Sequence, residues 1–212
     1  MRFWKGHALG NDYIVLDDDA TVPSPAVIRA LCDRHRGVGS DGVLVPVPGR
    51  AAPGRGNGAA NGPGEQTAPV AAGLRIFNPD GTEAEKSGNG LRIFGAWLHL
   101  TGQAGGDPVP VALPGETVEM AVEGVGAPGF VLVRVDMGRA SFRAGAVGYT
   151  DAGADDEVMG VPVEVDGEEV AVHLVTMGNP HCVFFVDDLE QVDVAALGPQ
   201  LERHPLYPRR TN

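Results

Sequence analysis

The feature that most constrains the fold is the glycine-rich stretch 87–90 (Ser-Gly-Asn-Gly), which stands between a strand pattern and a helix pattern. The apolar run 74–77 predicts a short strand, and the Asn-Pro-Asp-Gly turn at 78–81 follows it. The helix pattern rests on apolar residues at helical spacing: Leu91, Phe94 and Leu98. The stretch therefore predicts a helix N-terminus whose unpaired backbone N–H groups can bind a carboxylate or a phosphate. The alternative is a plain capped helix, with Ser87 or Asn89 as the cap.

Strand patterns outnumber helix patterns along the rest of the chain. The pairs Pro114-Gly115 and Asp166-Gly167 each separate two apolar runs and predict hairpins. A further helix is expected from Pro25 to about Arg36. Many short strands with few helices predict an α+β fold in two lobes, which we expect to cover residues 1–122 and 123–212.

Two segments between strands carry little apolar surface. Residues 48–73 consist mostly of Gly, Ala, Pro and Asn, so we expect a flexible surface insert within the first lobe. Residues 6–12 contain two glycines, and we expect a turn there between two strands.

Charge and cysteine usage narrow the class of protein. The net charge of −12 argues against nucleic acid and anionic membranes as partners. No signal peptide is expected, and no apolar run approaches the roughly 20 residues of a membrane span. Cys32 and Cys182 lie far apart and predict neither a zinc site nor a disulfide framework. We therefore expect a cytoplasmic protein with no metal.

Four turns combine glycine with an asparagine. They carry Asn11, Asn78, Asn89 and Asn179. An asparagine side chain offers an acceptor and two donors without charge, so several that converge could bind a zwitterion with ammonium and carboxylate groups. The alternative is that Asn and Gly are simply common turn residues.

Six stretches, taken in order along the chain, resemble the diaminopimelate epimerase family. They are residues 6–13, 34–42, 77–85, 87–92, 177–181 and 207–212. The resemblance implies two pseudo-symmetric α+β lobes of mixed and antiparallel sheet around a central helix. It also implies a small amino-acid substrate, with inversion of LL- to meso-2,6-diaminopimelate in the lysine and cell-wall pathway. No cofactor is expected, and a homodimer is kept as an expectation.

The resemblance assigns roles to individual residues. Those that match substrate-binding positions are Asn11, Asn78, Asn179 and Asn212. Gly88 and Asn89 match the turn that holds the α-carboxylate.

Two departures from the family bear on catalysis. Ser87 stands where the family carries a cysteine, and a hydroxyl is a far weaker acid than a thiol. His181 is expected to assist Ser87 if the two turns meet, although a structural hydrogen bond within its own turn is the alternative. Family members also continue past the position of Asn212 to a second cysteine, so the second lobe is expected to be incomplete.

Three functions therefore compete. The first is a diaminopimelate epimerase, with Ser87 and His181 as catalytic residues. The second is an isomerase or dehydratase on the same scaffold that transfers a proton on one face only, which Ser87 favours. The third is an inactive amino-acid-binding homologue that keeps the asparagines. Exchange of the substrate α-proton with solvent separates the two enzymes from the binding protein.

Overall fold

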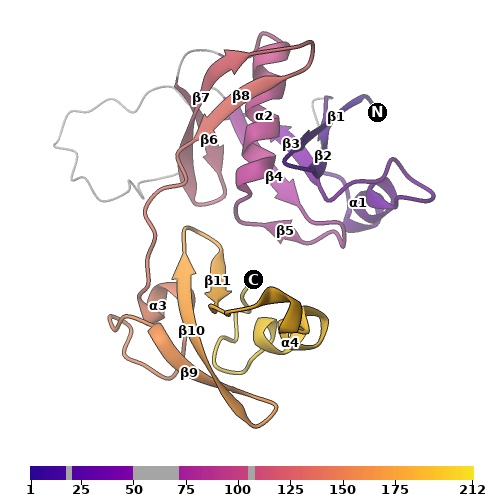
Figure 1. Ribbon diagram of the computed structural model, residues 1–212. Helices are drawn as coiled ribbons and strands as arrows, with labels where there is room; N and C mark the ends of the chain where they lie inside the picture. Colours follow the sequence, from indigo (N-terminus) through magenta and orange to yellow (C-terminus); the bar gives the residue numbers. More distant parts are fainter. Residues whose placement is uncertain (18–20, 50–71, 105–107) are drawn as a thin grey trace, which may run out of the picture. The chain divides into compact units, whose positions relative to one another are not determined.

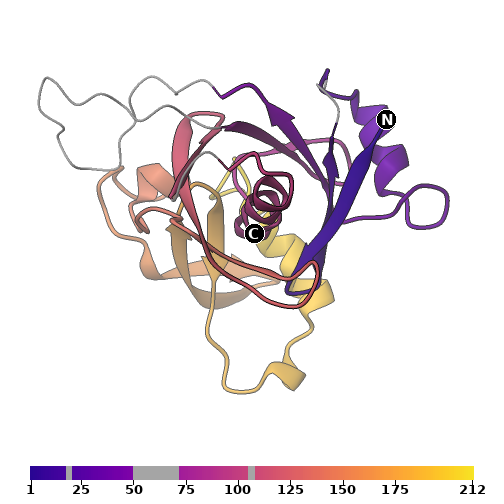
Figure 2. The same cartoon turned by 90° about the horizontal axis from the view of Figure 1, so that it is seen from above.

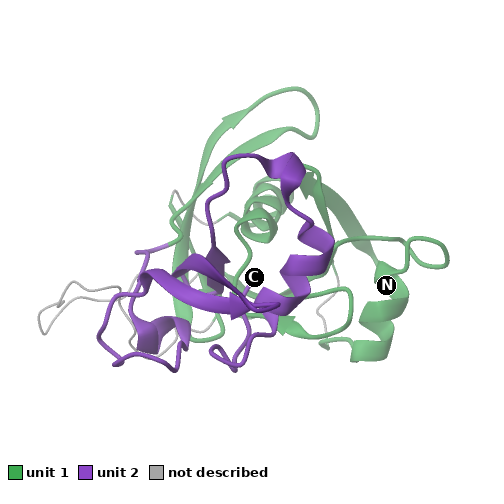
Figure 3. Cartoon of the chain, turned by 60° about the horizontal axis from the view of Figure 1, so that its bottom comes forward, with its two compact units in different colours: residues 1–137 green, residues 138–212 purple. Residues whose placement is uncertain are grey.

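The computed structural model describes residues 1–17, 21–49, 72–104 and 108–212, which form two compact units (Figure 1). Unit 1 comprises residues 1–137 and unit 2 comprises residues 138–212 (Figure 3). Most of the predicted insert 48–73 lies outside the described residues, but its end is structured. Ala72 and Gly73 begin a strand, and Gly73 pairs with Val47.

The described residues of unit 1 form one mixed sheet and two helices. Its elements are β1 (Phe3–Ala8), β2 (Asn11–Leu16), α1 (Pro25–Cys32), β3 (Val43–Val47), β4 (Ala72–Phe77), β5 (Glu83–Ala84), α2 (Gly88–Leu100), β6 (Val109–Leu113), β7 (Glu116–Val125) and β8 (Val131–Val135). The strand order is β1-β2-β3-β4-β6-β7-β8, with β5 on β4. The β2–β3 and β4–β6 pairs are parallel and the others are antiparallel.

The helix α2 lies at the centre of unit 1, and the sheet curves around it (Figure 2). Its buried residues occur on most sides of the helix, as expected for a helix enclosed by sheet. They are Gly90, Leu91, Ile93, Phe94, Gly95, Trp97 and Leu98. The Phe94 and Trp97 rings stack with centroids 5.5 Å apart. The predicted α+β class with a central helix is confirmed.

The division between the units falls after Met137 rather than between 122 and 123. The predicted boundary lies inside β7, which continues to pair with β8 through Val125 and Val131. Because a paired strand cannot be cut without breaking its ladder, β7 and β8 stay in unit 1.

One predicted turn and one predicted helix have different limits in the structure. The turn expected over 6–12 is only Leu9-Gly10, since β1 and β2 pair through Ala8 and Asn11. The helix expected to reach Arg36 ends at Cys32. The Asp33 carboxylate accepts hydrogen bonds from the backbone N–H groups of the second and third residues after it, which forms a tight turn in place of further helix.

Unit 2 contains a smaller antiparallel sheet in the order β11-β10-β9. Its elements are α3 (Ala144–Val147), β9 (Met159–Val165), β10 (Glu168–Thr176), β11 (Pro180–Val183), the 3-10 helix η1 (Leu189–Gln191) and α4 (Val194–Glu202). The predicted Asp166-Gly167 hairpin is confirmed, and both residues have the positive φ of a type I′ turn. Unit 2 has a hydrophobic core of its own, which includes Val172, Leu174 and Tyr207. The pseudo-symmetry of the two lobes stays a prediction.

No described helix is long and apolar enough to cross a lipid bilayer.

Candidate functional site

The first turn of α2 is the centre of the candidate site, and the helix begins where the sequence predicted a helix N-terminus. Ser87 is the N-cap, and its Oγ accepts a hydrogen bond from Gly90 N at 3.1 Å. Gly88 and Asn89 are the first residues of the helix, where backbone N–H groups have no intrahelical carbonyl partner. These N–H groups and the positive end of the helix dipole favour an anion at this turn.

A tyrosine hydroxyl lies beside Ser87. The Tyr13 hydroxyl oxygen is 3.2 Å from Ser87 Oγ, and either oxygen can be the donor. Tyr13 is buried in the core of unit 1, and its ring lies close to Gly42. Ser87 Oγ therefore contacts a backbone donor and a phenol at once. Sequence reasoning did not assign Tyr13 a role, although it ends the first of the six family-like stretches.

Two of the predicted asparagines lie next to each other. Asn89 Nδ2 donates a long hydrogen bond of 3.5 Å to Asn11 Oδ1, which joins the start of β2 to the start of α2. Asn89 Oδ1 accepts from Arg92 Nη1 at 3.0 Å. The structure thus brings Asn11, Ser87 and Asn89 into one region of unit 1.

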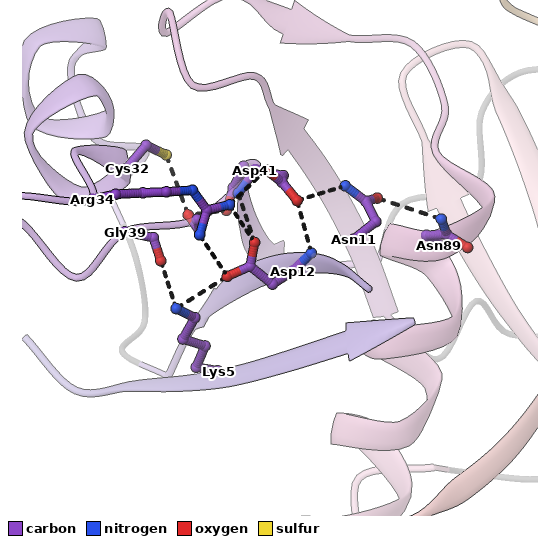
Figure 4. Close-up of polar contacts among 10 residues, drawn as sticks. Lys5, Asn11, Asp12, Cys32, Arg34, Gly39, Asp41 and Asn89 are labelled. Atoms are coloured by element: carbon purple, nitrogen blue, oxygen red, sulfur yellow. Dashed lines mark hydrogen bonds and ion pairs between the residues drawn. The ribbon is translucent and has the colours of Figure 1, made fainter. Parts of the chain in front are cut away.

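Four charged side chains next to Asn11 form a network of ion pairs, here called the four-charge cluster (Figure 4). They are Lys5, Asp12, Arg34 and Asp41. Asp12 accepts from Arg34 Nη2 at 2.7 Å and pairs with Lys5 Nζ at 3.0 Å. Arg34 Nη2 also donates to Asp41 at 2.6 Å. The cluster contains two positive and two negative groups, so its charges balance. Asp12, Arg34 and Asp41 lie within two of the family-like stretches, and Lys5 lies outside them. The sequence predicted no role for these four residues.

The cluster strongly favours the ionised form of Asp12. The hydrogen bond from Arg34 is the largest reason that the pKa of Asp12 lies well below its ordinary value, and Lys5 adds to the effect while burial opposes it. The same hydrogen bond, followed by the one to Asp41, raises the pKa of Arg34. The hydrogen bond between Asp12 and Arg34 therefore favours the charged forms of both side chains.

Asp12→Asn is expected to remove part of the acid sensitivity of the fold. Because the folded-state pKa of Asp12 is lowered, its ionised form stabilises the fold fully above the ordinary aspartate pKa of about 3.9. That contribution is lost as the pH falls below this value toward the folded-state pKa. Urea unfolding across this pH range should show the free energies of the unaltered chain and the variant converging with acidity. Parallel curves would contradict the role of Asp12.

Asn78 lies at the end of β4 and bonds within its own turn. Its Nδ2 donates to Thr82 Oγ1 at 3.0 Å, and its backbone N–H donates to the Thr82 carbonyl at 2.8 Å. A substrate-binding role for Asn78 stays a prediction.

The other predicted residues belong to unit 2. Asn179 lies immediately before β11, and His181 lies within it. Asn212 pairs with this strand, because its N–H donates to the Pro180 carbonyl at 3.0 Å and its own carbonyl accepts from Cys182 N at 2.8 Å. The backbone of Asn212 is therefore hydrogen-bonded to the two residues that flank His181 in the sequence. No described group of three or more His, Cys, Asp or Glu side chains is placed to hold a metal ion.

Residues 3–143 match the family model described as diaminopimelate epimerase. A diaminopimelate epimerase of Desulfitobacterium hafniense is 36% identical to this chain, covering all of it and 69% of the relative. Diaminopimelate epimerase 2 of Nostoc sp. is 39% identical, again over the whole chain and 67% of the relative. The similarity thus extends over both units.

Solved structures of related fold include other amino-acid racemases and epimerases. A probable proline racemase from Agrobacterium radiobacter superposes with a TM-score of 0.58 at 14% identity, covering 95% of this chain and 54% of its own. A hydroxyproline epimerase from Agrobacterium vitis gives a TM-score of 0.57 at 13% identity, covering 95% and 55%. This chain thus spans little more than half the length of these two proteins. At such identities the likeness is one of fold.

Proposed function

The chain belongs to the diaminopimelate epimerase family, and from that premise we propose that it binds 2,6-diaminopimelate and moves the proton of its α-carbon. The reaction is the interconversion of the LL and meso forms, which serves lysine and peptidoglycan synthesis in this family. The observation that carries the proposal is the first turn of α2, where Ser87, Asn89 and Asn11 lie together. Relatives named diaminopimelate epimerase, aligned over the whole chain, support it.

The substrate α-carboxylate is proposed to bind at Gly88 and Asn89. Backbone N–H groups at the start of α2 and the amide of Asn89 supply donors, and the helix dipole adds attraction for negative charge. The uncharged oxygens of asparagine side chains supply acceptors for ammonium groups. The proposal extends to the remaining asparagines: Asn11, Asn78, Asn179 and Asn212.

Ser87 is proposed to occupy the place of the proton-transfer group. Its hydroxyl cannot readily remove a weakly acidic α-proton at neutral pH without help. The structure adds Tyr13 as an immediate neighbour, at 3.2 Å from Ser87 Oγ. His181 is kept as a second proposed proton-transfer residue, because an imidazole can both accept and donate a proton. Proton transfer between such groups needs no cofactor.

Two other functions remain as alternatives to the epimerase, and Ser87 favours the first of them. One is an isomerase or dehydratase on this scaffold that transfers the proton on one face only. The other is a binding protein that holds an amino acid without turning it over. Incubation with LL-diaminopimelate in deuterated water, followed by NMR, separates the three. Loss of the α-proton signal together with the meso form supports the epimerase, loss without inversion supports one-sided transfer, and no loss supports binding alone.

We propose a cytoplasmic location and the absence of nucleic-acid and membrane partners from the net charge and the cysteines. The net charge of −12 supports a protein that binds neither nucleic acid nor anionic membranes. Both cysteines are free thiols, which suits a reducing cytoplasm. Assembly into a homodimer is also proposed, and sedimentation of the purified chain tests it.

Asn89→Ala is expected to weaken binding of meso-diaminopimelate by roughly 5- to 150-fold, because a charged ligand group loses its hydrogen-bond partner at about 1–3 kcal/mol. Titration calorimetry measures the change. Gln103→Ala is the matched control, since it removes an amide just beyond the other end of α2. Equal affinities for the Asn89 variant and the unaltered chain would contradict the carboxylate role.

A further inference from the structure

The two ends of the Asn11 carboxamide have different hydrogen-bond partners, Asp41 and Asn89. Asn11 Nδ2 donates to Asp41 Oδ2 at 3.1 Å, while Asn11 Oδ1 accepts from Asn89 Nδ2 at 3.5 Å. An ionised carboxylate can only accept hydrogen bonds, so it selects the amide nitrogen over the amide oxygen. The flip in which Asn11 turns its oxygen toward Asp41 would place two acceptors against each other.

Asp41 is itself held in place from two sides. Arg34 Nη2 donates to Asp41 Oδ1 at 2.6 Å, and the Asp12 backbone N–H donates to Asp41 Oδ2 at 3.1 Å. The Asp41 backbone N–H also donates to the Asp12 carbonyl at 2.8 Å. Both carboxylate oxygens of Asp41 therefore have partners that hold them in place. Oδ2, which accepts from the Asp12 backbone, also accepts from Asn11. Figure 4 shows this line of contacts from Arg34 through Asp41 and Asn11 to Asn89.

We propose that Asp41 is a positioning residue for ligand binding, which turns the carbonyl oxygen of Asn11 toward Asn89 and the first turn of α2. The proposal rests on the function proposed above, because it concerns how the same turn receives its ligand. With this orientation, an acceptor from Asn11 lies beside the donors of Asn89. Such a pairing of acceptor and donors suits a zwitterionic α-amino acid, whose ammonium group needs the acceptor and whose carboxylate needs the donors.

Asp41→Asn tests the proposal with almost no change in shape. The new carboxamide can donate as well as accept, so it no longer distinguishes the two ends of the Asn11 amide. Glu123→Gln is the matched control, because Glu123 also receives an arginine donor at 2.6 Å and is about as exposed as Asp41. If any loss of a surface ion pair had the same effect, both variants would behave alike.

The first measurement concerns the Asn11 side chain and needs no activity. With isotope-labelled asparagine, the side-chain NH₂ resonances of Asn11 are assigned through their absence in Asn11→Ala. Asp41→Asn is expected to shift these resonances and speed their exchange with solvent, whereas Glu123→Gln leaves them in place. Unchanged Asn11 resonances in Asp41→Asn would overturn the proposal.

The second measurement is the affinity for meso-diaminopimelate by calorimetry. Asp41→Asn is expected to weaken binding by about fivefold to tenfold, the scale of one ordinary hydrogen bond. Asn11→Ala should make the further Asp41→Asn change nearly silent, since Asp41 acts through Asn11. Equal losses in the presence and absence of Asn11 would overturn the proposal.

Failure of the proposed function gives a different result. If the unaltered chain does not bind diaminopimelate, the function above is wrong, and the NH₂ resonances still decide whether Asp41 orients Asn11. If they move only in Asp41→Asn, the orientation holds. If they also move in Glu123→Gln, it is overturned.

Discussion

Replacing Ser87 by cysteine is expected to raise α-proton exchange on one face of diaminopimelate by about 10²- to 10⁴-fold, the usual range for a positioned acid or base. A thiol has an ordinary pKa of about 8.5, and a helix N-terminus lowers that pKa and favours the thiolate. Ser87 is the N-cap of α2, so a cysteine sulfur at this place would meet the positive end of the helix. Loss of the α-proton signal in deuterated water measures the rate.

Ser24→Cys provides the control for that experiment. Ser24 is the N-cap of α1 and accepts from Val27 N, so its replacement puts a thiol at another helix N-terminus. No gain in exchange is expected from it. Rapid inversion by the unaltered chain would contradict the expectation for Ser87. In that case Tyr13→Phe would tell whether the phenol beside Ser87 Oγ is needed for the rate.

Gly42→Ala is expected to lower the free energy of unfolding by about 1–3 kcal/mol, or more, through overpacking. A Cβ on Gly42 would lie 2.5 Å from Tyr13 Cε1 and 2.6 Å from the Phe77 carbonyl oxygen. The first atom belongs to a buried ring and the second to the backbone of β4, so neither can move without disturbing the sheet. Because the Tyr13 ring would be displaced, the contact of its hydroxyl with Ser87 should also be lost.

Urea unfolding measures the effect of Gly42→Ala. Gly124→Ala is the matched control, since a Cβ on this β7 residue would meet no atom within 4 Å. Its free energy of unfolding should stay close to that of the unaltered chain. If the two variants had the same stability, the tight contact at Gly42 would not be a constraint on the fold.

Local signals predicted those parts of the fold that depend on neighbouring residues. The capping residue Ser87 and the apolar spacing after it predicted α2 correctly. Both signals are local, since the capping hydroxyl and the N–H group that it binds are only three residues apart. The hairpin at Asp166-Gly167 followed from the need of its turn for positive φ. The helix α1 shows the limit of such signals. Asp33 competes for backbone donors and ends it earlier than its apolar spacing suggested.

Contacts between distant parts of the chain could not be predicted in the same way. Tyr13 and Ser87 are separated by 74 residues, and Asn11 and Asp41 by 30. The first contact depends on the packing of α2 against the sheet, and the second on the parallel pairing of β2 with β3. No local pattern specifies either of them. The resemblance marked the stretches that contain these residues. Their physical roles came only from the contacts.

The placement of the aromatic residues gives the two units different optical properties. Both tryptophans, Trp4 and Trp97, belong to unit 1, and Trp97 is buried against Phe94. Unit 2 contains two tyrosines, Tyr149 and Tyr207, and no tryptophan. Tryptophan fluorescence therefore reports the unfolding of unit 1 alone, while circular dichroism reports the secondary structure of both. Coincident transitions would mean that the units unfold as one cooperative body, and separate transitions would give each unit its own stability.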